Sequence, residues 1–527
     1  MADSPVSDTE RVRTAEVIAA ACLATDLGMG FPFEHGLQAT LVTCRLAERL
    51  AVGPETTAEA FYVSLLMYSG CTTDSDIAAG IFGGSLTRSM TARQFGSTFE
   101  SLGGVISALP DPDSGTLKSG LEIAARFPKA ARFRRSHFTA LCEVAMMLSE
   151  RLGLPDEING LFRYLTERWD GKGVLGRMAG DDIPVALRIV TAARDAAYQT
   201  MVGGEEHAAR VIRDRAGHAF DPEVAMVLSD NASEILATGN DTPSVWDSVL
   251  DAEPGPHLTL DSGGVDRALG ALGDFADMVS PSLVGHSSGV ARLAGEAATG
   301  LGMTPAEVTR VRRAGLVHDI GRVAVHPRIW QKDSSLNADE WEQVRLHAYQ
   351  TERVFNRSPF LAPVAAVACR HHERIDGSGY HRGLKGTTLE PASRLLAAAD
   401  AFHAMTEPRD HRPPMPLAEA AELLREESSA GRHDGEMVAA VLRASGQQTS
   451  PVERPAGLTV RELQVIRLLA RGLQTKQVAR TLDISAKTAD RHIQNAYRKI
   501  GVSTRAAATL YASDHGLVQW GELPISP

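Results

Sequence analysis

The sequence predicts an all-α protein that contains about three domains. Ala-rich stretches with few alternating β-branched residues favour helix along most of the chain. A length of 527 residues exceeds what one hydrophobic core supports. Two stretches rich in Pro, Gly and polar residues, 238–264 and 445–457, lack a periodic apolar face and are predicted linkers. We therefore expect domains at residues 11–238, 264–444 and 458–520.

Charge is distributed unevenly along the chain. The net charge of −11 by itself argues against a nucleic-acid partner. Residues 458–512, however, contain ten Lys or Arg against three Asp or Glu, a local balance of +7, so the remainder carries −18. An acidic body with one basic module is the asymmetry expected when only that module meets phosphate.

No segment of the sequence indicates export or a membrane span. The first thirteen residues are polar and carry acids, and no apolar run approaches the roughly 20 residues that cross a bilayer. The five cysteines are odd in number and show no paired spacing. We expect them to be reduced and mostly buried in a cytoplasmic protein.

The first two regions read as copies of one another. His286 precedes the pair His318-Asp319 by 32 residues, and His35 precedes Met67-Tyr68 by the same number. Residues 167–173 (ERWDGKG) match residues 373–379 (ERIDGSG), and a Gly and an Arg follow each at equal spacing. The copies close on AGHAFDPEVAMVL from residue 216 and AGRHDGEMVAAVL from residue 430. Four matches in one order favour duplication over chance likeness between Ala-rich helices. The N-terminal copy holds 45 extra residues, at about 75–135.

A helix signal precedes the histidine-aspartate pair of the central copy. Thr304-Pro-Ala-Glu307 is a capping box with Pro at the first helical position. It predicts a helix that carries His318 and Asp319 and stops at Gly321.

Histidine is concentrated in the central region. Nine of the seventeen lie within residues 286–411, and they include the adjacent pairs His318-Asp319 and His371-His372. A lone histidine on a helix is usually a packed or surface residue, but two such pairs on apolar helical stretches are costly to bury without partners. Metal ions remove that cost, because imidazole and carboxylate suit iron, manganese, cobalt or zinc and a carboxylate can bridge two ions. Two ions would activate a bridging water against a phosphodiester.

These motifs resemble those of the HD-GYP phosphodiesterases, a family of metal-dependent phosphohydrolases. The resemblance covers about residues 266–443 and rests on HDIGR from residue 318, LHAYQTERVF around residue 347, HHERIDGSGYHRG from residue 371, and Asp400 with AMTEPRDHR after it. It implies a helical domain that binds metal and hydrolyses cyclic dinucleotides, chiefly cyclic di-GMP. The metal ligands that it implies are His286, His318, Asp319, His347, His371, His372 and Asp400.

The same resemblance implies roles in catalysis and substrate binding. Asp319 would bridge the metal ions, and Arg322 would lie near the scissile phosphate or its leaving oxygen, so these two are the expected catalytic residues. The substrate-binding residues that it implies are Arg322, Gly379, Tyr380, Arg409 and Arg412.

Three positions depart from the family pattern. Ser282 stands where three-metal members carry Glu, so we expect two divalent transition-metal ions, iron or manganese ahead of zinc, cobalt or nickel. The GYP signature reads Gly379-Tyr380-His381, without its proline, and Arg322 stands in place of a Lys that it does not fully replace. The ligand set is complete, which favours hydrolysis. Binding without turnover, or another phosphorylated nucleotide as substrate, are the alternatives.

The N-terminal copy lacks the residues of a metal site. Met67-Tyr68 replaces the His-Asp pair, Leu165-Thr166 replaces the His-His pair and Arg194 replaces the last aspartate. His35 is kept, and His137 is the candidate counterpart of the histidine in LHAYQ. We expect a structural role in dimerisation or in support of the second copy, with sensing through a remodelled pocket as the alternative.

The basic C-terminal module reads as four short helices. A short helix, a tight turn and a longer helix with a polar face form the helix-turn-helix plan. A capping box of Thr459 and Glu462 opens the first helix. The expected N-caps are Thr459, Thr475, Ser485 and Thr504, and the expected helix ends are Gly472, Leu482 and Gly501.

Polar side chains of the third helix have the spacing to line a major groove, and nearby cations could neutralise phosphates. A solvated basic bundle is the alternative interpretation. The expected groove residues are Lys487, Thr488, Arg491, His492, Gln494 and Asn495, and the expected phosphate contacts are Lys476, Arg498, Lys499 and Arg505.

The module resembles the LuxR/GerE-type helix-turn-helix along about sixty residues. The resemblance rests on the segments LTVRELQVIRLLARG and VARTL, and on the short motifs IS, KT, RHI, KIGV and TR, which follow one another in this order. Gln474-Thr475 stands where Ser-Asn is usual, and Ala489 where Val is usual. The family implies binding to double-stranded DNA as a homodimer, often through the last helix, about residues 504–515.

Together these regions predict a bacterial one-component regulator that binds DNA and senses or hydrolyses a cyclic dinucleotide. In one form of this hypothesis the chain is an enzyme whose turnover lowers the local signal. In the other, the metal site only binds ligand and the chain is a transcription factor with an enzyme-derived sensor.

Overall fold

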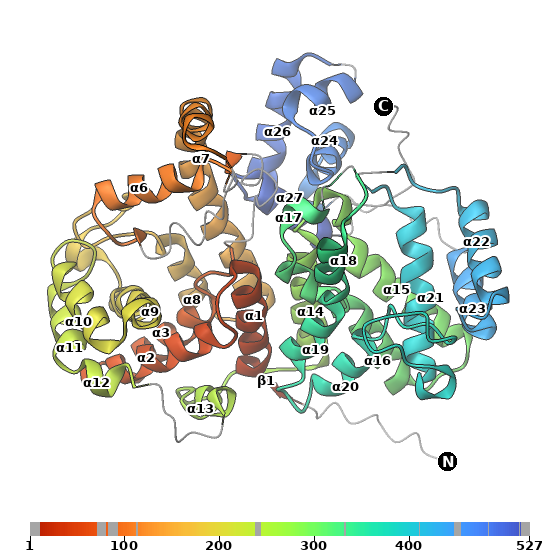
Figure 1. Ribbon diagram of the computed structural model, residues 1–527, viewed down its shortest axis with the longest axis horizontal. Coiled ribbons are helices and arrows are strands. Elements are labelled where there is room, and N and C mark those ends of the chain that lie inside the picture. The colour runs from red at the N-terminus through yellow and green to blue at the C-terminus, as the bar shows by residue number, and fades with distance from the viewer. Residues whose placement is uncertain are drawn as a thin grey trace. The chain divides into compact units, whose positions relative to one another are not determined.

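The computed structural model describes residues 11–70, 81–82, 93–111, 114–237, 244–330, 332, 334–409, 412–446, 455–482, 484–515 and 517. Within these residues the protein is all-α, as the sequence predicts, apart from one antiparallel pair of two-residue strands (Figure 1). The chain divides into two compact units, Met1–Val265 and Asp266–Pro527. No helix in the described part of the chain is both long and apolar enough to span a bilayer.

The first unit is built around α1, α2, α3 and α9, which pack on one another. Its strands are β1 (Val12–Arg13) and β2 (Thr259–Leu260). Its helices are α1 (Thr14–Met29), α2 (His35–Arg49), α3 (Pro54–Leu66), α6 (Thr98–Ala108), α7 (Thr116–Arg151), α8 (Asp156–Leu161), α9 (Val185–Gly203), α10 (Glu205–Asp214), α11 (Pro222–Asp230), α12 (Ala232–Ile235) and α13 (Val245–Asp251).

The predicted linker 238–264 is partly folded. It contains α13 and β2, and β2 pairs with β1 at the start of the chain. Glu253, fully buried as a side chain, accepts hydrogen bonds from Arg13 (2.8 Å from Nε) and from Tyr62 (2.5 Å). These buried polar contacts fix the segment to the first unit, and sequence composition alone could not predict them. Most of the second predicted linker, residues 447–454, lies outside the described residues.

The second unit contains the central copy and the C-terminal module. In the central copy α15 packs on α16, α21 and α23. Its helices are α14 (Ser262–Asp277), α15 (His286–Gly300), α16 (Pro305–Val317), α17 (Pro327–Trp330), α18 (Ala338–Arg345), α19 (His347–Phe355), α20 (Ala362–Ala368), α21 (Pro391–Thr406), α22 (Leu417–Ser429) and α23 (Gly435–Ser445).

Equivalent buried contacts recur in the two units. In each, an aspartate near the C-terminal end of one α-helix accepts the backbone N–H of the residue that follows the histidine at the start of the next α-helix. In each, an arginine near the start of a later helix pairs with the aspartate that caps a subsequent helix. These pairs are Asp26–Gly36 (3.0 Å) and Arg188–Asp221 (3.1 Å) in the first unit, and Asp277–Ser287 (2.9 Å) and Arg394–Asp434 (3.0 Å) in the second.

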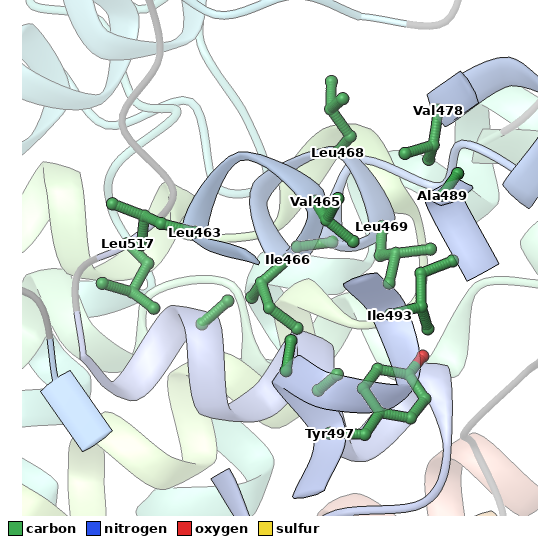
Figure 2. Close-up of a cluster of buried hydrophobic side chains, with 14 of the residues drawn as sticks. Leu463, Val465, Ile466, Leu468, Leu469, Val478, Ala489, Ile493, Tyr497 and Leu517 are labelled. Carbon is green, nitrogen blue, oxygen red and sulfur yellow. The ribbon is translucent and has the colours of Figure 1, made fainter. Parts of the chain in front are cut away.

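The C-terminal module is four helices around one hydrophobic cluster (Figure 2). Leu463, Ile466 and Leu469 contribute from the first helix, and Ile493 and Tyr497 from the third. Three of the four predicted N-caps are confirmed; the second helix is capped by Gln474 rather than Thr475. The helices are α24 (Val460–Ala470), α25 (Thr475–Thr481), α26 (Ala486–Ile500) and α27 (Arg505–Asp514).

The module packs against the segment that leads into α15. Val284, which lies two residues before His286, belongs to the buried hydrophobic cluster of the module. Gly472, between α24 and α25, approaches Pro281 so closely that a Cβ on the glycine would lie 2.8 Å from the proline Cβ. Ser513 of α27 donates a hydrogen bond to the buried Asp274 of α14. The second unit is therefore continuous from the histidine cluster to the C-terminal module.

Candidate metal centre and nucleic-acid interface

The histidine-aspartate pair lies just beyond the end of α16. The predicted capping box of Thr304 and Glu307 is present, but α16 ends at Val317 and His318 is its C-cap. The prediction that the helix carries both residues and stops at Gly321 was therefore wrong. Gly321 is needed for another reason: a Cβ there would lie 1.9 Å from the carbonyl oxygen of His347. This close approach brings α19 against the pair.

Asp319 lies at the centre of the predicted ligands and divides them into two groups. Its Oδ2 lies 3.4 Å from Nε2 of His286 and 3.0 Å from Nε2 of His318. Its Oδ1 lies 3.4 Å from Nε2 of both His347 and His371. One carboxylate thus faces two sets of imidazoles, which is the arrangement required of a ligand that bridges two metal ions.

Asp400 and His372 complete the two groups. Oδ1 of Asp400 lies 3.2 Å from Nε2 of His286 and 3.7 Å from Nε2 of His318. Nδ1 of His372 lies 3.9 Å from the other oxygen of Asp400, and its ring contacts that of His371. All seven predicted ligands come together, and all but His372 are almost fully buried.

The outer nitrogens of four of the histidines are fixed by hydrogen bonds. Nδ1 of His318 lies 2.8 Å from the carbonyl of Gly315, Nδ1 of His371 lies 2.7 Å from that of Ala368, and Nδ1 of His347 contacts that of Val344. A carbonyl only accepts, so these Nδ1 atoms carry the proton and Nε2 presents its lone pair to the centre. Such outer hydrogen bonds orient metal-binding histidines.

The cluster fits a cationic cofactor because its inner atoms have no hydrogen-bond partner among the described residues. These buried atoms are Nε2 of His286 and His318, Oδ1 of Asp319 and Oδ1 of Asp400. Leaving so many polar atoms unsatisfied would cost several kcal/mol. Burial alone would raise the pKa of Asp319, yet the charge of Arg322 holds it well below its usual value. The centre thus combines imidazole nitrogens with ionised carboxylates, a set of donors that suits divalent transition metals.

The sequence did not single out Glu407 and His403, which lie behind the first histidine. Oε2 of the fully buried Glu407 lies 2.7 Å from Nδ1 of His286, and its Oε1 lies 3.1 Å from Nδ1 of His403. Four histidines of the centre have an Nδ1 atom fixed by a hydrogen bond. Among these four, His286 alone is held by a carboxylate. Both residues belong to the segment after Asp400, where only spacing to the motif could have drawn attention to them.

The predicted substrate-binding residues are not equally placed. Arg322 pairs with Oδ2 of Asp319 at 2.8 Å and lies over the ring of Trp330. Tyr380 stacks near His372, with ring centroids 4.6 Å apart. A Cβ on Gly379 would lie 2.4 Å from the carbonyl oxygen of His372, so glycine is required for this approach.

The two predicted phosphate-binding arginines have other contacts in this structure. Arg409 bonds Glu407 through Nη2 at 3.1 Å. Arg412 donates to the carbonyls of Ala404 and Met405, and the backbones of the two arginines bridge each other. Both side chains contact Glu407, Arg409 at its carboxylate and Arg412 at its backbone carbonyl.

The first unit has a cation where the second has Asp400. The buried Arg194 lies over the ring of Tyr68 at 4.5 Å and donates to the carbonyl of Gly36. Burial, aided by Arg194, lowers the pKa of His35 to about 3 and keeps it neutral. Among the described residues of this unit no three potential ligand atoms converge. His137 instead stacks on Phe133 in α7.

Helix α26 presents a polar stripe opposite its buried face. Ala489, Ile493, Ala496 and Tyr497 are buried in the module, whereas Lys487, Arg491 and Gln494 are exposed at i, i+4 and i+7. Thr488, His492 and Asn495 flank this stripe and are half-buried, and Lys476 and Arg498 are exposed beside it. The stripe has the geometry needed to enter a major groove.

Five predicted DNA contacts have intramolecular partners, and two of them, Arg498 and Asn495, hydrogen-bond each other at 3.1 Å. Lys499 binds Glu462 at 2.7 Å and the carbonyl of Gly457 at 3.0 Å. Arg505 donates to the carbonyl of Gly472. The hydroxyl of Thr488 lies 2.8 Å from that of Ser485, the N-cap of α26. The contacts of Lys499 and Arg505 join helices of the module, which the spacing of charges along the sequence could not reveal. The other contacts lie within α26 or at its N-cap.

Two family matches cover the second unit. Residues 271–437 match the HD domain, and residues 456–512 match the bacterial regulatory proteins of the luxR family. The chain is 26% identical over 416 residues to the 3'3'-cGAMP-specific phosphodiesterase 3 of Vibrio cholerae. The aligned segment covers 78% of this chain and 90% of that protein.

Two further comparisons agree. The cyclic di-GMP phosphodiesterase of Thermotoga maritima is 35% identical over 189 residues, 35% of this chain and 50% of that protein. The crystal structure of the cyclic GMP-AMP-specific phosphodiesterase V-cGAP3 of V. cholerae has the same fold, with a TM-score of 0.58, 23% identity, and coverage of 83% of this chain and 99% of that one. This chain thus contains an HD domain at residues 271–437 and, at residues 456–512, a domain of the luxR family of bacterial regulatory proteins.

Proposed function

We propose that this protein is a DNA-binding regulator whose HD domain hydrolyses a cyclic dinucleotide at a centre of two metal ions. The observation that carries the proposal is the position of Asp319, whose two oxygens each face a separate pair of histidine Nε2 atoms within 3.0–3.4 Å. The relatives named above act on cyclic di-GMP or 3'3'-cGAMP, which supports this substrate class.

Each protein group has a definable part in this reaction. His286, His318 and Asp400 would hold one ion, His347, His371 and His372 the other, and Asp319 both. Bound ions would lower the pKa of a water between them and stabilise charge on the phosphodiester oxygens. Arg322, next to Asp319, is placed to meet a phosphate oxygen, and Tyr380 offers a ring on which a base could stack.

Hydrolysis is tested on the full chain with Mn²⁺ and either cyclic di-GMP or 3'3'-cGAMP, with products separated by chromatography. We expect a linear dinucleotide or mononucleotides, and loss of product by at least about 100-fold in His318→Ala and Asp319→Ala, because metal-centred activation is lost. His326→Ala, which changes an exposed histidine of the same domain, is the matched control. The faster of the two substrates identifies the preferred nucleotide.

A ligand-sensing protein without turnover is the second candidate. It is favoured by the ion pair between Arg322 and Asp319 and by His381 in place of the proline of the signature loop. Tight binding of the nucleotide with no product over several hours would establish this function and exclude the enzyme.

DNA binding is tested by fluorescence anisotropy with duplex DNA. Lys487→Ala and Arg491→Ala remove the exposed cations of the α26 stripe, so each is expected to weaken binding by about 1–3 kcal/mol at a specific site. Arg443→Ala, which changes a cation on α23 outside the module, should leave affinity unchanged.

A further inference from the structure

The long helix α7 (Figure 1) carries a group of exposed cations outside the C-terminal module. Lys129, Arg132, Arg134 and Arg135 are all exposed and lie within seven residues. This group is called the α7 basic surface below. The helix begins within the extra segment of the N-terminal copy, which the central copy lacks.

The charge of this surface contrasts with that of its unit. Residues 1–265 contain 22 Lys or Arg and 36 Asp or Glu, a net charge of −14. Residues 116–140 contain six Lys or Arg and one Glu, a net charge of +5. Cations so concentrated in an acidic body repel one another, and a multivalent anion relieves that repulsion.

The four cations have no ion pair or hydrogen bond with any described residue. Two exposed arginines elsewhere in the unit do have carboxylate partners: Arg49 pairs with Glu234 at 2.5 Å and Arg213 with Asp230 at 2.6 Å. The α7 basic surface therefore presents charge that the described residues of the unit do not neutralise.

The helix beneath this surface is anchored by apolar packing. Phe133 and Ala130 of α7 are buried against Phe82, Ala108 and Leu109, with Phe127 packed beside them. The cations alternate with these anchors along the chain and are held at the surface. Six residues of helix rise by about 9 Å, which spans more than two phosphates of a DNA strand at about 3.4 Å each.

We propose that the α7 basic surface binds the phosphate backbone of DNA and adds contacts to those of the luxR-family domain. This inference rests on the proposed binding of DNA by the chain. The surface consists of charged side chains that can contact phosphates. We therefore expect it to bind DNA through the phosphate charge and not to distinguish base sequences. It gives the N-terminal unit, whose described residues form no metal cluster, a role in holding the regulator on DNA.

The test compares the salt dependence of DNA binding between full-length proteins. Affinity for a 30-base-pair duplex is measured by fluorescence anisotropy from low to moderate salt for the wild type and for Lys129→Gln/Arg132→Gln/Arg134→Gln/Arg135→Gln. Removal of one cation that neutralises a phosphate should reduce the slope of log K against log salt by about 0.9. For the quadruple variant we expect the slope to fall by one to four times about 0.9, according to how many of the four cations contact phosphates. Its affinity at low salt should be at least about tenfold weaker than that of the wild type.

Arg49→Gln/Arg213→Gln is the matched control, because it removes cations that already have carboxylate partners. Its slope should equal that of the wild type. An unchanged slope in the quadruple variant overturns the inference while DNA binding by the chain stands. A wild type that binds no duplex at all overturns the proposed function itself.

Two other outcomes would assign the surface to a different partner and overturn the inference. The first is a quadruple variant that binds DNA normally but dissociates in sedimentation experiments, which would indicate an acidic surface of a second copy. The second is binding of the wild type, but not of the variant, to vesicles of anionic phospholipid with DNA binding unchanged.

Discussion

At the scale of single residues, Glu407 distinguishes His286 from the other histidines of the centre. Its carboxylate lies 2.7 Å from Nδ1 of His286, whereas His318, His347 and His371 are held by neutral carbonyls. Burial opposes a charge on His286, but the Glu407 carboxylate raises the pKa of the imidazole well above its usual value. A carboxylate partner makes an imidazole a more basic ligand and fixes its orientation.

Glu407→Gln is therefore expected to weaken metal binding by about 10- to 100-fold. The amide keeps the shape of the side chain but removes its charge. The measurement is a calorimetric titration of the metal-free full chain with Mn²⁺. His403→Asn, which changes another contact of the same carboxylate, should have a smaller effect. Equal affinity in Glu407→Gln and the wild type would show that Glu407 serves packing alone.

Asp26 in the first unit gives a prediction for the dependence of stability on pH. Burial raises its pKa to about 7, although the N–H of Gly36 and the charge of Arg194 oppose this. A carboxyl whose pKa is raised by folding contributes stability that is complete below its unfolded value near 4 and is lost as pH rises through 7. The loss is at most roughly 4 kcal/mol, at about 1.36 kcal/mol per pKa unit.

In Asp26→Asn, the Tm of the first unit should therefore be nearly the same at pH 5 and pH 8. In the wild type, that Tm should be lower at pH 8 than at pH 5. The asparagine oxygen still accepts the N–H of Gly36, so the fold is kept. Asp230→Asn, an exposed carboxylate paired with Arg213, provides the control and should retain the profile of the wild type. A wild-type Tm independent of pH would refute the assignment.

At the scale of elements, the first helix of the C-terminal module depends on its N-cap. Thr459 accepts the N–H of Glu462, and Glu462 accepts the N–H of Thr459 in return. Thr459→Ala should cost about 1 kcal/mol. Hydrogen exchange of α24 in the full chain measures this loss, and Asn337→Ala, the equivalent change in the capping box of α18, should leave α24 unaffected.

Lys499 tests whether a cation of the module serves the fold or the DNA. Because it binds Glu462 and the carbonyl of Gly457, Lys499→Ala should increase hydrogen exchange in α24 and change the salt dependence of DNA binding little. Arg491→Ala should show the reverse pattern, since Arg491 is exposed on α26. A change in salt slope of about 0.9 in Lys499→Ala would instead assign it to a phosphate.

The sequence predicts these elements to different degrees. Capping boxes at Thr304 and Thr459 are local, so the N-termini of α16 and α24 could be placed correctly. The grouping of histidines with aspartates indicated the centre because burial of such residues requires a partner. The contact of Glu407 with His286 joins residues 121 positions apart, and the pairing of β2 with β1 spans more than 240. Contacts at such separations depend on tertiary packing, which periodicity and composition do not contain.

At the scale of the whole molecule, metal binding should stabilise only part of the chain. The centre lies within the second unit, and the described residues of the first show no comparable cluster. Mn²⁺ at about 100 times its Kd should add about 2.7 kcal/mol to the stability of the unit that binds it. Differential scanning calorimetry should therefore show one transition raised by several degrees and another unchanged. In His318→Ala the metal should move neither transition, and a shift of both in the wild type would contradict the assignment.

The packing of the C-terminal module against Pro281, Val284 and Asp274 limits how such proteins could exchange their output domains. A foreign helix-turn-helix joined after α23 would need a small residue opposite Pro281, an apolar surface for Val284 and a hydroxyl opposite Asp274. Recombination at the interdomain connection alone would not supply these features. The module and the HD domain are thus expected to be inherited as a matched pair, and chimeras should succeed only when the α14–α15 connection is transplanted with them.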